Sequence, residues 1–550
     1  MLLLQPLLGG LRPALAQAPL ARMISVVWFK RDLRVTDHAP LREAARHGPV
    51  LPVYLFEPDL LAQPDASPRH LGFVLECLDE LETRLAALGS PLQRWQGEAT
   101  RVLAELHTRL GPFRLFSHEE TGNLASYRRD RDVARWCRAH AIEWQQWPSA
   151  GVVRQLHDRD AWSTLWVARM TPPPLAAPDA LQAPPALSPS PLRLFPGEAP
   201  RGLAWHPDAL PDQPGRQTGG RQQARRLARH FFDQHLPDYR KGMSSPLSAG
   251  DTCSRLSPYL AFGCVSVQEV IHAVWRRRAE LQALPPELRP RGHLAGLKSF
   301  ESRLHWHCHF IQKLESEPTL ETQEMHGAFA GLRDAHFSPE RLTRWCRGET
   351  GFPLIDACMA MLRHTGWINF RMRALLVAFS SYQLWQPWQR PALHLAREFL
   401  DYEPGIHYPQ VQMQSGTTGI NTLRIYNPVK QARDQDPDGR FVRQWLPALA
   451  RLPDEWLFEP WNMPRTTQQR VGLVIGRDYP EPLVDHEAAA RHARDTLWAL
   501  RKDEVVRREA RTVYEKHGSR NPAREGAPRK RRSRQTTATD SALQLGLDFG

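Results

Sequence analysis

Three hydroxyl side chains precede an apolar run near the middle of the chain. Thr252, Ser254 and Ser257 lie before or at the start of residues 258–265, which are mostly apolar. Hydroxyls and free backbone amides at the beginning of a helix can bind a phosphate, because the helix dipole places positive potential there. The same residues also fit an ordinary N-cap of a buried helix. The pattern therefore indicates either a phosphate site or a helix cap.

A second group of reactive side chains consists of typical metal ligands: His305, His307, Cys308 and His309. On a helix, only positions three or four residues apart share a face, so these side chains cannot converge on one ion. The seven cysteines of the chain contain no CxxC pair. We therefore expect neither a metal nor a disulfide site, and a reducing cytoplasmic environment.

The composition is that of a soluble globular protein. With 550 residues the chain exceeds what one core usually fills, so we expect two domains with tails. Its mean hydropathy is −0.50, and no apolar run approaches the roughly 20 residues of a membrane span. The net charge is +13, to which eleven basic and five acidic residues after position 506 contribute +6. The remainder is compatible with a polyanion-binding face or with simple solvation.

Apolar runs alternate with helical patterns in the first part of the chain. Runs with the length of buried strands occur at residues 25–29, 50–56, 114–117 and 142–147. Helical periodicity is found between them, at 71–88 and 128–140. This alternation predicts a parallel sheet with crossover helices.

A proline-dense stretch, residues 171–200, separates this part from a mainly helical one. Proline lacks an amide donor and disfavours helix and sheet, so we expect a connector that runs over the surface. Helical periodicity then dominates from about 218 to 501, for example at 353–365, 370–383 and 391–401. Many of the 18 tryptophans fall here, and most of them should pack a core.

Four blocks of sequence carry a resemblance to a known family. They are residues 26–37 (VVWFKRDLRVTD), 253–263 (CSRLSPYLAFG), 302–307 (SRLHWH) and 424–447 (RIYNPVKQARDQDPDGRFVRQWLP). In this order they resemble the photolyase/cryptochrome family, and the resemblance runs from about residue 24 to about residue 461. It implies an α/β N-terminal antenna domain with a doubly wound parallel sheet and an all-α C-terminal FAD-binding domain.

The resemblance and the composition together suggest domain boundaries. Residues 23–155 would form the antenna domain, 156–217 the interdomain connector and 218–501 the helical FAD-binding catalytic domain. Residues 502–550 are basic and low in aromatic side chains, so we expect a disordered tail. We interpret residues 1–22 as an overlong start or an extension, with Met23 as the natural beginning. We expect a cytoplasmic monomer.

The resemblance assigns FAD binding to a defined set of residues. They are Tyr239, Cys253, Ser254, Arg255, Leu256, Ser257, Arg303, Trp306, Phe310, Trp367, Phe370, Arg373, Asp401, Tyr402, Glu403 and His407. Tyr239 and residues 253–257 would hold the phosphates, and Cys253 stands where the family often has threonine. Arg373 and Asp401 would form an ion pair beside the flavin ring, which stabilises the reduced anionic flavin. Alternatively, this pair simply joins two helices.

The chain departs from the family pattern around the flavin. Phe370 stands where many members have asparagine, and His407 lies at the position that usually faces flavin N5. Val411, Gln412 and Met413 replace the aromatic pair of the WQW motif, so the flavin-proximal tryptophan of the usual electron-transfer chain is absent.

Other aromatic residues offer a substitute route for electrons. Trp388 matches the next tryptophan of the usual chain, and Trp385, Tyr402, Tyr408 and Tyr426 are candidates to complete it. Each of these rings could equally serve only to pack the core.

Two functions compete at the expected substrate pocket. Trp306 matches the tryptophan that stacks on a flipped pyrimidine dimer, which implies UV-damaged DNA as partner and light-driven dimer repair by reduced FAD. Arg303 replaces a glutamate that commonly bonds the dimer. Arg303, Phe370 and the missing tryptophan favour a cryptochrome photoreceptor instead, whereas Trp306 and the basic charge favour repair.

The resemblance also implies a second, antenna chromophore of pterin, deazaflavin or flavin type in or near the cleft between the domains. Its identity does not follow from the sequence. His118, Glu119 and Glu120 follow a predicted strand, and we expect them near this chromophore.

The end of the chain suggests a protein partner. Residues 544–549 (QLGLDF) resemble the peptide by which bacterial repair and replication proteins bind the sliding clamp, and the basic residues 529–534 would hold it near DNA phosphates. A peptide of residues 541–550 should therefore bind the clamp in a titration, and Gln544→Ala and Phe549→Ala should each weaken that binding. No binding, or binding indifferent to both changes, would indicate an unselected terminus.

Overall fold

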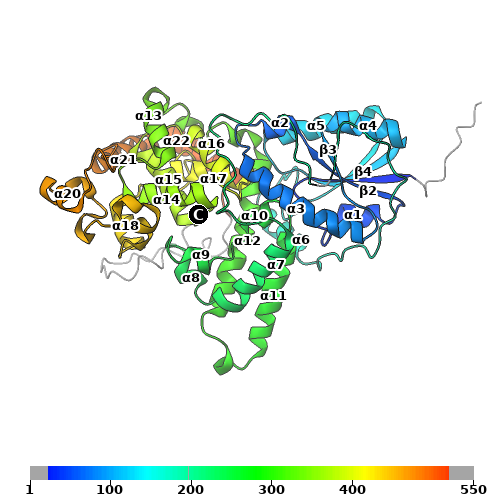
Figure 1. Ribbon diagram of the computed structural model, residues 1–550, viewed down its shortest axis with the longest axis horizontal. Helices are drawn as coiled ribbons and strands as arrows, with labels where there is room; N and C mark the ends of the chain where they lie inside the picture. The colour runs from blue at the N-terminus through cyan, green and yellow to red at the C-terminus, as the bar shows by residue number, and fades with distance from the viewer. Residues whose placement is uncertain (1–22, 196, 520–550) are drawn as a thin grey trace, which may run out of the picture.

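The computed structural model describes residues 23–195 and 197–519, which form an α/β unit and a helical unit packed against each other (Figure 1). The strands of the α/β unit are β1 Ile24–Phe29, β2 Val50–Phe56, β3 Gln93–Gln96, β4 Phe113–His118, β5 Glu143–Trp147 and β6 Arg193–Leu194. Its helices are α1 Ala39–Ala44, α2 Pro58–Leu61, α3 Pro68–Ala87, α4 Ala99–Leu110 and α5 Leu124–Ala139. The four predicted strands and both predicted helices are confirmed.

The sheet has the strand order β5-β4-β1-β2-β3-β6, and all of its pairs are parallel except β3 with β6. In register, Val26 of β1 pairs with Leu51 on one side and with Leu115 on the other. The chain builds outward from β1 to β3 and then returns to β1 to add β4 and β5. The carboxyl ends of β1 and β4 therefore face a topological switch point, where open α/β sheets bind ligands. This is the predicted doubly wound fold.

Two strands, β3 and β6, were not predicted from the sequence. β3 carries polar residues at three of its four positions, and its Arg94 is buried because Asp79 and Glu82 of α3 bond its guanidinium, each at 2.7 Å. The antiparallel edge strand β6 comes from the proline-dense stretch, in which we expected no sheet. An edge strand needs few amide donors, which makes such a sequence tolerable there.

The expected connector, 156–217, also contains a buried helix, which precedes the proline-dense stretch 171–200 that we expect to run over the surface. α6 (Trp162–Met170) buries Trp162, Trp166 and Met170. The ring centres of Trp162 and Trp166 each lie 4.9 Å from that of His305 in the helical unit. The connector is therefore part of the packing between the units.

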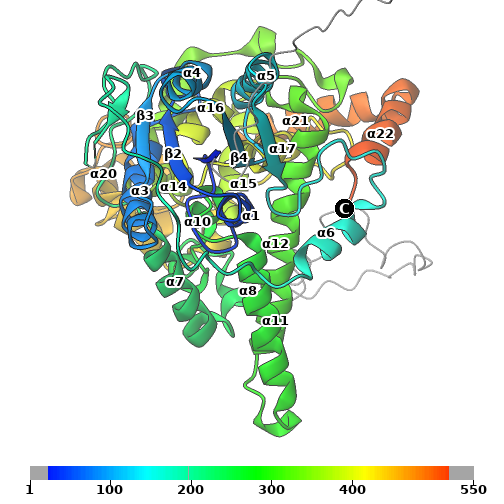
Figure 2. The same cartoon turned by 90° about the vertical axis from the view of Figure 1, so that its right-hand side faces the viewer.

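The helical unit begins with α7 and follows the predicted periodicity. Its helices are α7 Arg221–His230, α8 Tyr239–Gly242, α9 Ala249–Thr252, α10 Ser257–Ala261, α11 Val267–Ala283, α12 His293–Ser316, α13 Pro339–Arg347, α14 Pro353–Thr365, α15 Phe370–Ala378, α16 Gln389–Glu398, α17 Pro404–Ser415, α18 Pro428–Gln435, α19 Arg440–Trp445, α20 Arg465–Val471, α21 His486–Lys502 and α22 Glu504–His517. Two π-helical segments, Phe231–His235 and Phe379–Gln383, continue α7 and α15. α11 and α12 form a hairpin that projects from the unit, as Figure 2 shows.

The prediction of a disordered tail over 502–550 is wrong for its first residues, which are helical. Residues 504–517 form α22, where His517 bonds Glu317 and the carbonyl of Val506 accepts a hydrogen bond from His326 at 2.9 Å. These contacts anchor α22 on the helical unit, so residues 504–517 belong to the folded part of the chain. Residues 1–22 and the clamp-like motif at 544–549 lie outside the described residues. Within the described ranges, no helix is both long and apolar enough to cross a membrane.

The two units share one hydrophobic core. Phe73 of α3 packs between two rings of the helical unit, with ring centres 5.4 Å from Tyr259 and 5.3 Å from Phe262. At the start of α3, Arg69 is 2% exposed and pairs with Glu398 of α16 at 3.1 Å. Arg69 also donates to backbone carbonyls of the helical unit. A buried arginine thus fastens the α/β unit to the helical one.

Replacing Arg69 should destabilise the folded protein. Arg69→Ala should lower the free energy of unfolding by about 3–5 kcal/mol, because it leaves the Glu398 carboxylate buried without its partner. Chemical denaturation monitored by tryptophan fluorescence would measure the loss. Arg46, whose pair with Glu43 is exposed, is the control: Arg46→Ala should cost at most about 1 kcal/mol. Equal losses in the two variants would contradict a special role for Arg69.

Candidate cofactor and substrate site

The segment expected to hold phosphates runs between α9 and α10. α10 begins after Leu256 and has no side-chain cap, so the hydroxyls do not serve as its N-cap. It ends at Ala261, earlier than the predicted helix over 258–265. Ser257 instead hydrogen-bonds Asp401, and the Ser254 hydroxyl accepts from the Leu256 amide at 3.4 Å. Phosphate binding by this segment stays a prediction.

Two buried polar atoms beside this segment have no hydrogen-bond partner among the described residues: Nε of Arg255 and Oδ1 of Asn369. Arg255 has a left-handed φ of 54°, and its guanidinium lies 3.9 Å from the centre of the Trp367 ring. Asn369 donates through Nδ2 to the carbonyls of Met243 and Ser244. Buried polar atoms without partners are costly and rare, so the region fits a polar ligand such as a dinucleotide.

Two further predicted cofactor residues, Tyr239 and Cys253, are uncharged at neutral pH. Tyr239 is 7% exposed and hydrogen-bonds Arg303. Burial raises the pKa of Tyr239 above its ordinary value and that of Cys253 to about 11, although Arg255 and Arg303 oppose the second shift. Neither group therefore adds a negative charge where a pyrophosphate would bind.

The expected ion pair between Arg373 and Asp401 is present. Nη1 and Nη2 of Arg373 lie 3.0 and 2.8 Å from the two carboxylate oxygens, and Nε donates to the carbonyl of Ile368 at 2.8 Å. The guanidinium also lies 4.1 Å from the centre of the Phe399 ring. Burial opposes ionisation of Asp401, but Arg373 outweighs it and holds the pKa of Asp401 below its ordinary value. A fixed, paired cation therefore lies in the site.

The residues after Asp401 are held from the other unit. Arg31, which follows β1, donates to the carbonyl of Tyr402 at 2.8 Å and to that of Ala261 at 2.9 Å, and pairs with Glu403 at 3.1 Å. His407 donates from Nε2 to the carbonyl of Ala392 at 2.9 Å. Burial lowers the pKa of His407 to about 4, so its ring is neutral at neutral pH.

The expected substrate side lies on α12. Arg303 and Trp306 are three residues apart on this helix, and Phe310 follows one turn later. The ring centre of Trp306 lies 5.7 Å from that of Phe310 and 4.8 Å from that of His309. Phe370 opens α15 and is 40% exposed. α12 thus places the Trp306 ring one turn from Arg303. Arg303 in turn hydrogen-bonds Tyr239, a predicted cofactor residue.

Among the candidate electron carriers, Trp388 packs against Tyr408, the residue that follows His407. Its ring centre lies 6.4 Å from that of Tyr408, and its indole nitrogen donates to Glu324 at 3.1 Å. Trp385 belongs to another cluster, which packs against α21. Val411 stands at one of the two positions that lack an aromatic ring, and its neighbour Gln412 is fully buried on α17.

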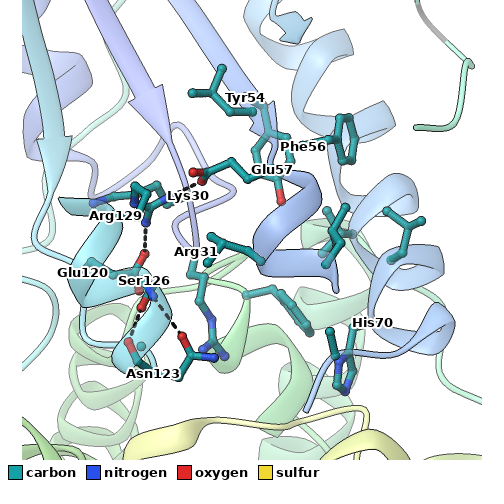
Figure 3. A pocket seen from close by; sticks show the side chains of 18 of the residues that line it. Lys30, Arg31, Tyr54, Phe56, Glu57, His70, Glu120, Asn123, Ser126 and Arg129 are labelled. Carbon is teal, nitrogen blue, oxygen red and sulfur yellow. Dashed lines mark hydrogen bonds and ion pairs between the residues drawn. The ribbon is translucent and has the colours of Figure 1, made fainter. Parts of the chain in front are cut away.

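A pocket of about 990 Å³, including the part open to solvent, lies at the topological switch point (Figure 3). Its lining comes from both units and includes Trp28, Glu57 and Arg129 of the α/β unit and Tyr402 of the helical one. Burial raises the pKa of Glu57 to about 7 although Arg129 opposes the shift. Of the three residues expected near an antenna chromophore, Glu120 lines the pocket.

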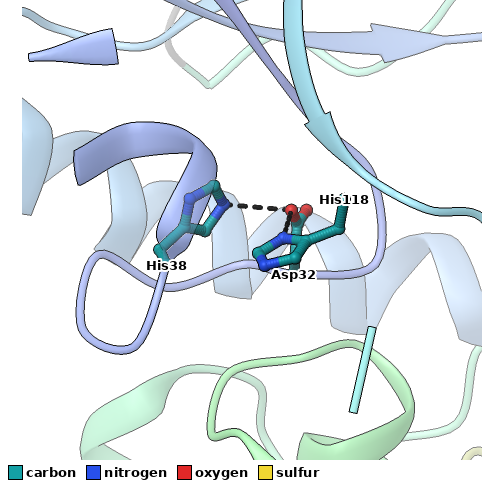
Figure 4. A group of neighbouring side chains, drawn as sticks. All are labelled: Asp32, His38 and His118. Carbon is teal, nitrogen blue, oxygen red and sulfur yellow. Dashed lines mark hydrogen bonds and ion pairs between the residues drawn. The ribbon is translucent and has the colours of Figure 1, made fainter. Parts of the chain in front are cut away.

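His118 has a different role from the one expected. It donates from Nδ1 to Asp32 at 2.6 Å, and Nε2 of His38 donates to the same carboxylate oxygen at 3.0 Å (Figure 4). These three residues are the only group in the described ranges close enough to hold a metal ion. However, the amide of Leu41 donates to Nδ1 of His38, so Nε2 carries the proton and offers no lone pair. The group is a structural hydrogen-bond centre that joins β4 to the loop after β1.

Several site residues were not singled out from the sequence: Arg31, Asp65, His70 and Asn369. Arg31 lies in the block 26–37 that carries the resemblance, and Asn369 lies beside Phe370, so both could have been found there. Asp65 and His70 carry no local signal, because their contacts with Tyr402 join positions more than 300 residues apart.

Comparisons with known proteins agree with this architecture. Residues 25–156 match the DNA photolyase family model and residues 300–499 match that of the FAD-binding domain of DNA photolyase. The chain is 29% identical to the deoxyribodipyrimidine photo-lyase of Streptomyces griseus, over 86% of this chain and 98% of that protein. It is 25% identical to cryptochrome-1 of Aedes aegypti, over 87% and 93%. The crystal structure of a class III photolyase from Agrobacterium tumefaciens superposes with a TM-score of 0.73 at 24% identity, over 89% of this chain and 100% of that one.

The Arg373–Asp401 pair provides the test of the cofactor site. Arg373→Ala and Asp401→Ala should each lose FAD on gel filtration or destabilise its reduced form, because each leaves an unpaired charge in the site. In the wild type, the contribution of the pair is complete above the ordinary aspartate pKa of about 3.9, and is lost as the pH falls through the lower folded-state pKa. Stable, stoichiometric FAD in both variants, measured by absorbance, would show that the pair only joins two helices.

Proposed function

Because the chain belongs to the photolyase/cryptochrome family, we propose that it repairs cyclobutane pyrimidine dimers in DNA by light-driven electron transfer. When bound, reduced FAD would supply the electron that splits the dimer. The observation that carries the proposal is the position of Trp306 on α12, one turn from Arg303, which bonds the cofactor residue Tyr239. An aromatic platform beside the cofactor is what a flipped dimer needs, since stacking offsets part of the cost of flipping.

The charged residues of the site suit this chemistry. Arg373 places a fixed positive charge in the cofactor site, which would favour an anionic, reduced flavin. Asp401 keeps the guanidinium in one orientation through two hydrogen bonds. His407 keeps its proton on Nε2, because a carbonyl can only accept, so Nδ1 holds a lone pair and the ring adds no charge.

A photoreceptor function of the cryptochrome type is the second candidate. Arg303 on the substrate side favours it, because a cation cannot accept the hydrogen bonds that a carboxylate would receive from a dimer. Phe370, where many members have asparagine, also favours it. The relatives include both photolyases and cryptochromes, and therefore do not decide between the two functions.

The pocket at the switch point would hold a second chromophore. It lies where open α/β sheets bind ligands, and it adjoins Tyr402, the residue after Asp401. Glu57 offers carboxyl oxygens and its partner Arg129 offers N–H donors at the pocket wall, which suits the mixed donors and acceptors of a flat heterocycle. The neighbouring Trp28 ring, over which Arg129 lies at 4.6 Å, adds apolar surface.

Replacing Trp306 tests the repair function. Trp306→Ala should weaken binding of dimer-containing duplex DNA by about 1–3 kcal/mol, the value of one base–aromatic stack, with little effect on undamaged DNA. Fluorescence titration with both duplexes would measure the difference. Trp498→Ala is the matched control, because Trp498 is 52% exposed on α21 and should leave both affinities unchanged.

A repair assay of the wild-type protein distinguishes the repair function from the photoreceptor function. Illuminated protein with reduced FAD should restore dimer-containing DNA to its undamaged form. If it binds damaged and undamaged duplexes equally and repairs neither, the photoreceptor function replaces the repair function.

A further inference from the structure

Three buried aromatic rings form a continuous series next to the cofactor site. The ring centre of Tyr408 lies 6.4 Å from that of Trp388 and 6.4 Å from that of Tyr402. The hydroxyl oxygens of the two tyrosines are 3.3 Å apart. Trp388, Tyr408 and Tyr402 are 1%, 2% and 8% exposed. An electron could thus pass between neighbouring rings without crossing solvent.

The series ends on a carboxylate from the other unit. Tyr402 donates its phenolic proton to Oδ2 of Asp65 at 2.5 Å, and Asn123 donates to the same oxygen at 3.0 Å. Burial, together with the charge of Asp65, raises the pKa of Tyr402 well above its ordinary value, so the phenol is protonated at rest. Oxidation makes a phenol a strong acid. A carboxylate already hydrogen-bonded to it can accept the proton at once.

Both tyrosines of the series lie beside the predicted cofactor residue His407, with ring centres each 5.3 Å from that of His407. Of the two, Tyr402 directly follows Asp401 in the chain. Arg31 holds its carbonyl at 2.8 Å, which fixes the backbone of this turn. Electrons from this ring therefore have a short path to a ligand that contacts Asp401 and His407.

The other candidate tryptophan is less suited to lose an electron. The guanidinium of Arg333 lies 4.7 Å from the centre of the Trp385 ring, and this positive charge raises the energy of an oxidised, cationic ring. Trp388 has the opposite environment, because its indole N–H donates to the carboxylate of Glu324. Electrostatics thus favours the series that contains Trp388.

We propose that Tyr402 is a proton-coupled electron donor to the light-excited oxidised flavin, and that Tyr408 connects it to Trp388. The inference rests on the proposed binding of FAD. In the step, the flavin gains one electron from Tyr402, the phenolic O–H bond breaks, and the proton passes to Asp65. The products are a neutral tyrosyl radical and a protonated Asp65 carboxyl group. An external thiol, or more slowly Trp388 through Tyr408, then returns an electron to Tyr402, and Asp65 returns the proton, which restores the phenol.

The experiment uses the full chain loaded with oxidised FAD, illuminated with blue light and frozen for electron paramagnetic resonance. The wild type should give a tyrosyl radical, and its formation should slow in deuterated solvent because a proton moves. Tyr402→Phe should lose the tyrosyl signal and slow flavin reduction, which absorbance follows. Asp65→Asn should also lose the neutral radical, whereas Asp65→Glu, which keeps an acceptor, should retain it.

The matched control is Tyr382→Phe. Tyr382 is 1% exposed, and its hydroxyl has no hydrogen-bond partner within the described ranges, so this variant should keep both signal and rate. An unchanged radical in Tyr402→Phe, or only a tryptophanyl radical in the wild type, would overturn the proposal. Absence of flavin from the wild type would overturn the proposed function as well.

Dimer repair with chemically reduced FAD separates the two proposals. Tyr402→Phe should repair like the wild type under these conditions, because the flavin then needs no donor. If neither protein repairs but the tyrosyl radical forms in the wild type alone, the donor role stands and the repair function fails.

Discussion

The interaction on which the site depends is the contact of Arg31 with three groups of the helical unit. Its guanidinium bonds the carbonyl of Ala261 through Nε and, through Nη2, the carbonyl of Tyr402 and the carboxylate of Glu403. The planar guanidinium group of Arg31 thereby fixes the end of α10 relative to the turn that follows Asp401. A lysine has a single nitrogen and could not make these contacts in the same geometry. The predicted cofactor residues are thus positioned by a side chain of the other unit.

Buried ion pairs at the interface of the units and within the α/β unit define one arrangement of their side chains. Arg69 and Glu398 are each 2% exposed, and Arg129 bonds Glu57, Glu120 and Asp130 together. Desolvation offsets much of the attraction in such groups, so they contribute less to stability than their number suggests. Any shifted arrangement, however, would leave at least one charge unpaired. This requirement keeps the pocket lining and the Asp401 turn in one geometry.

The sequence predicted those parts whose signal is local. Apolar runs identified β1 and β2, because buried parallel strands are continuously apolar. β4 and β5 were also located, although β4 contains Arg114 and β5 is a partly exposed edge strand with the sequence EWQQW. Sequence analysis missed β3, whose buried Arg94 depends on acidic residues of α3, and α22, whose polar surface resembles that of a tail. The Arg373–Asp401 pair came from the family resemblance and was then found in the structure. The link from Tyr402 to Asp65 could not be predicted, because it joins two units through a contact that no periodicity encodes.

Gln412 lies between Val411 and Met413, the two positions that lack the aromatic pair. The side chain of Gln412 accepts from the Met325 amide at 2.6 Å and donates to the carbonyls of Leu320 and Gln323. It therefore fixes the segment that carries Glu324, and Glu324 in turn bonds the indole nitrogen of Trp388. Gln412 thus holds in place the carboxylate beside Trp388, so the packing of α17 is consistent with an electron route through Trp388 and the tyrosines.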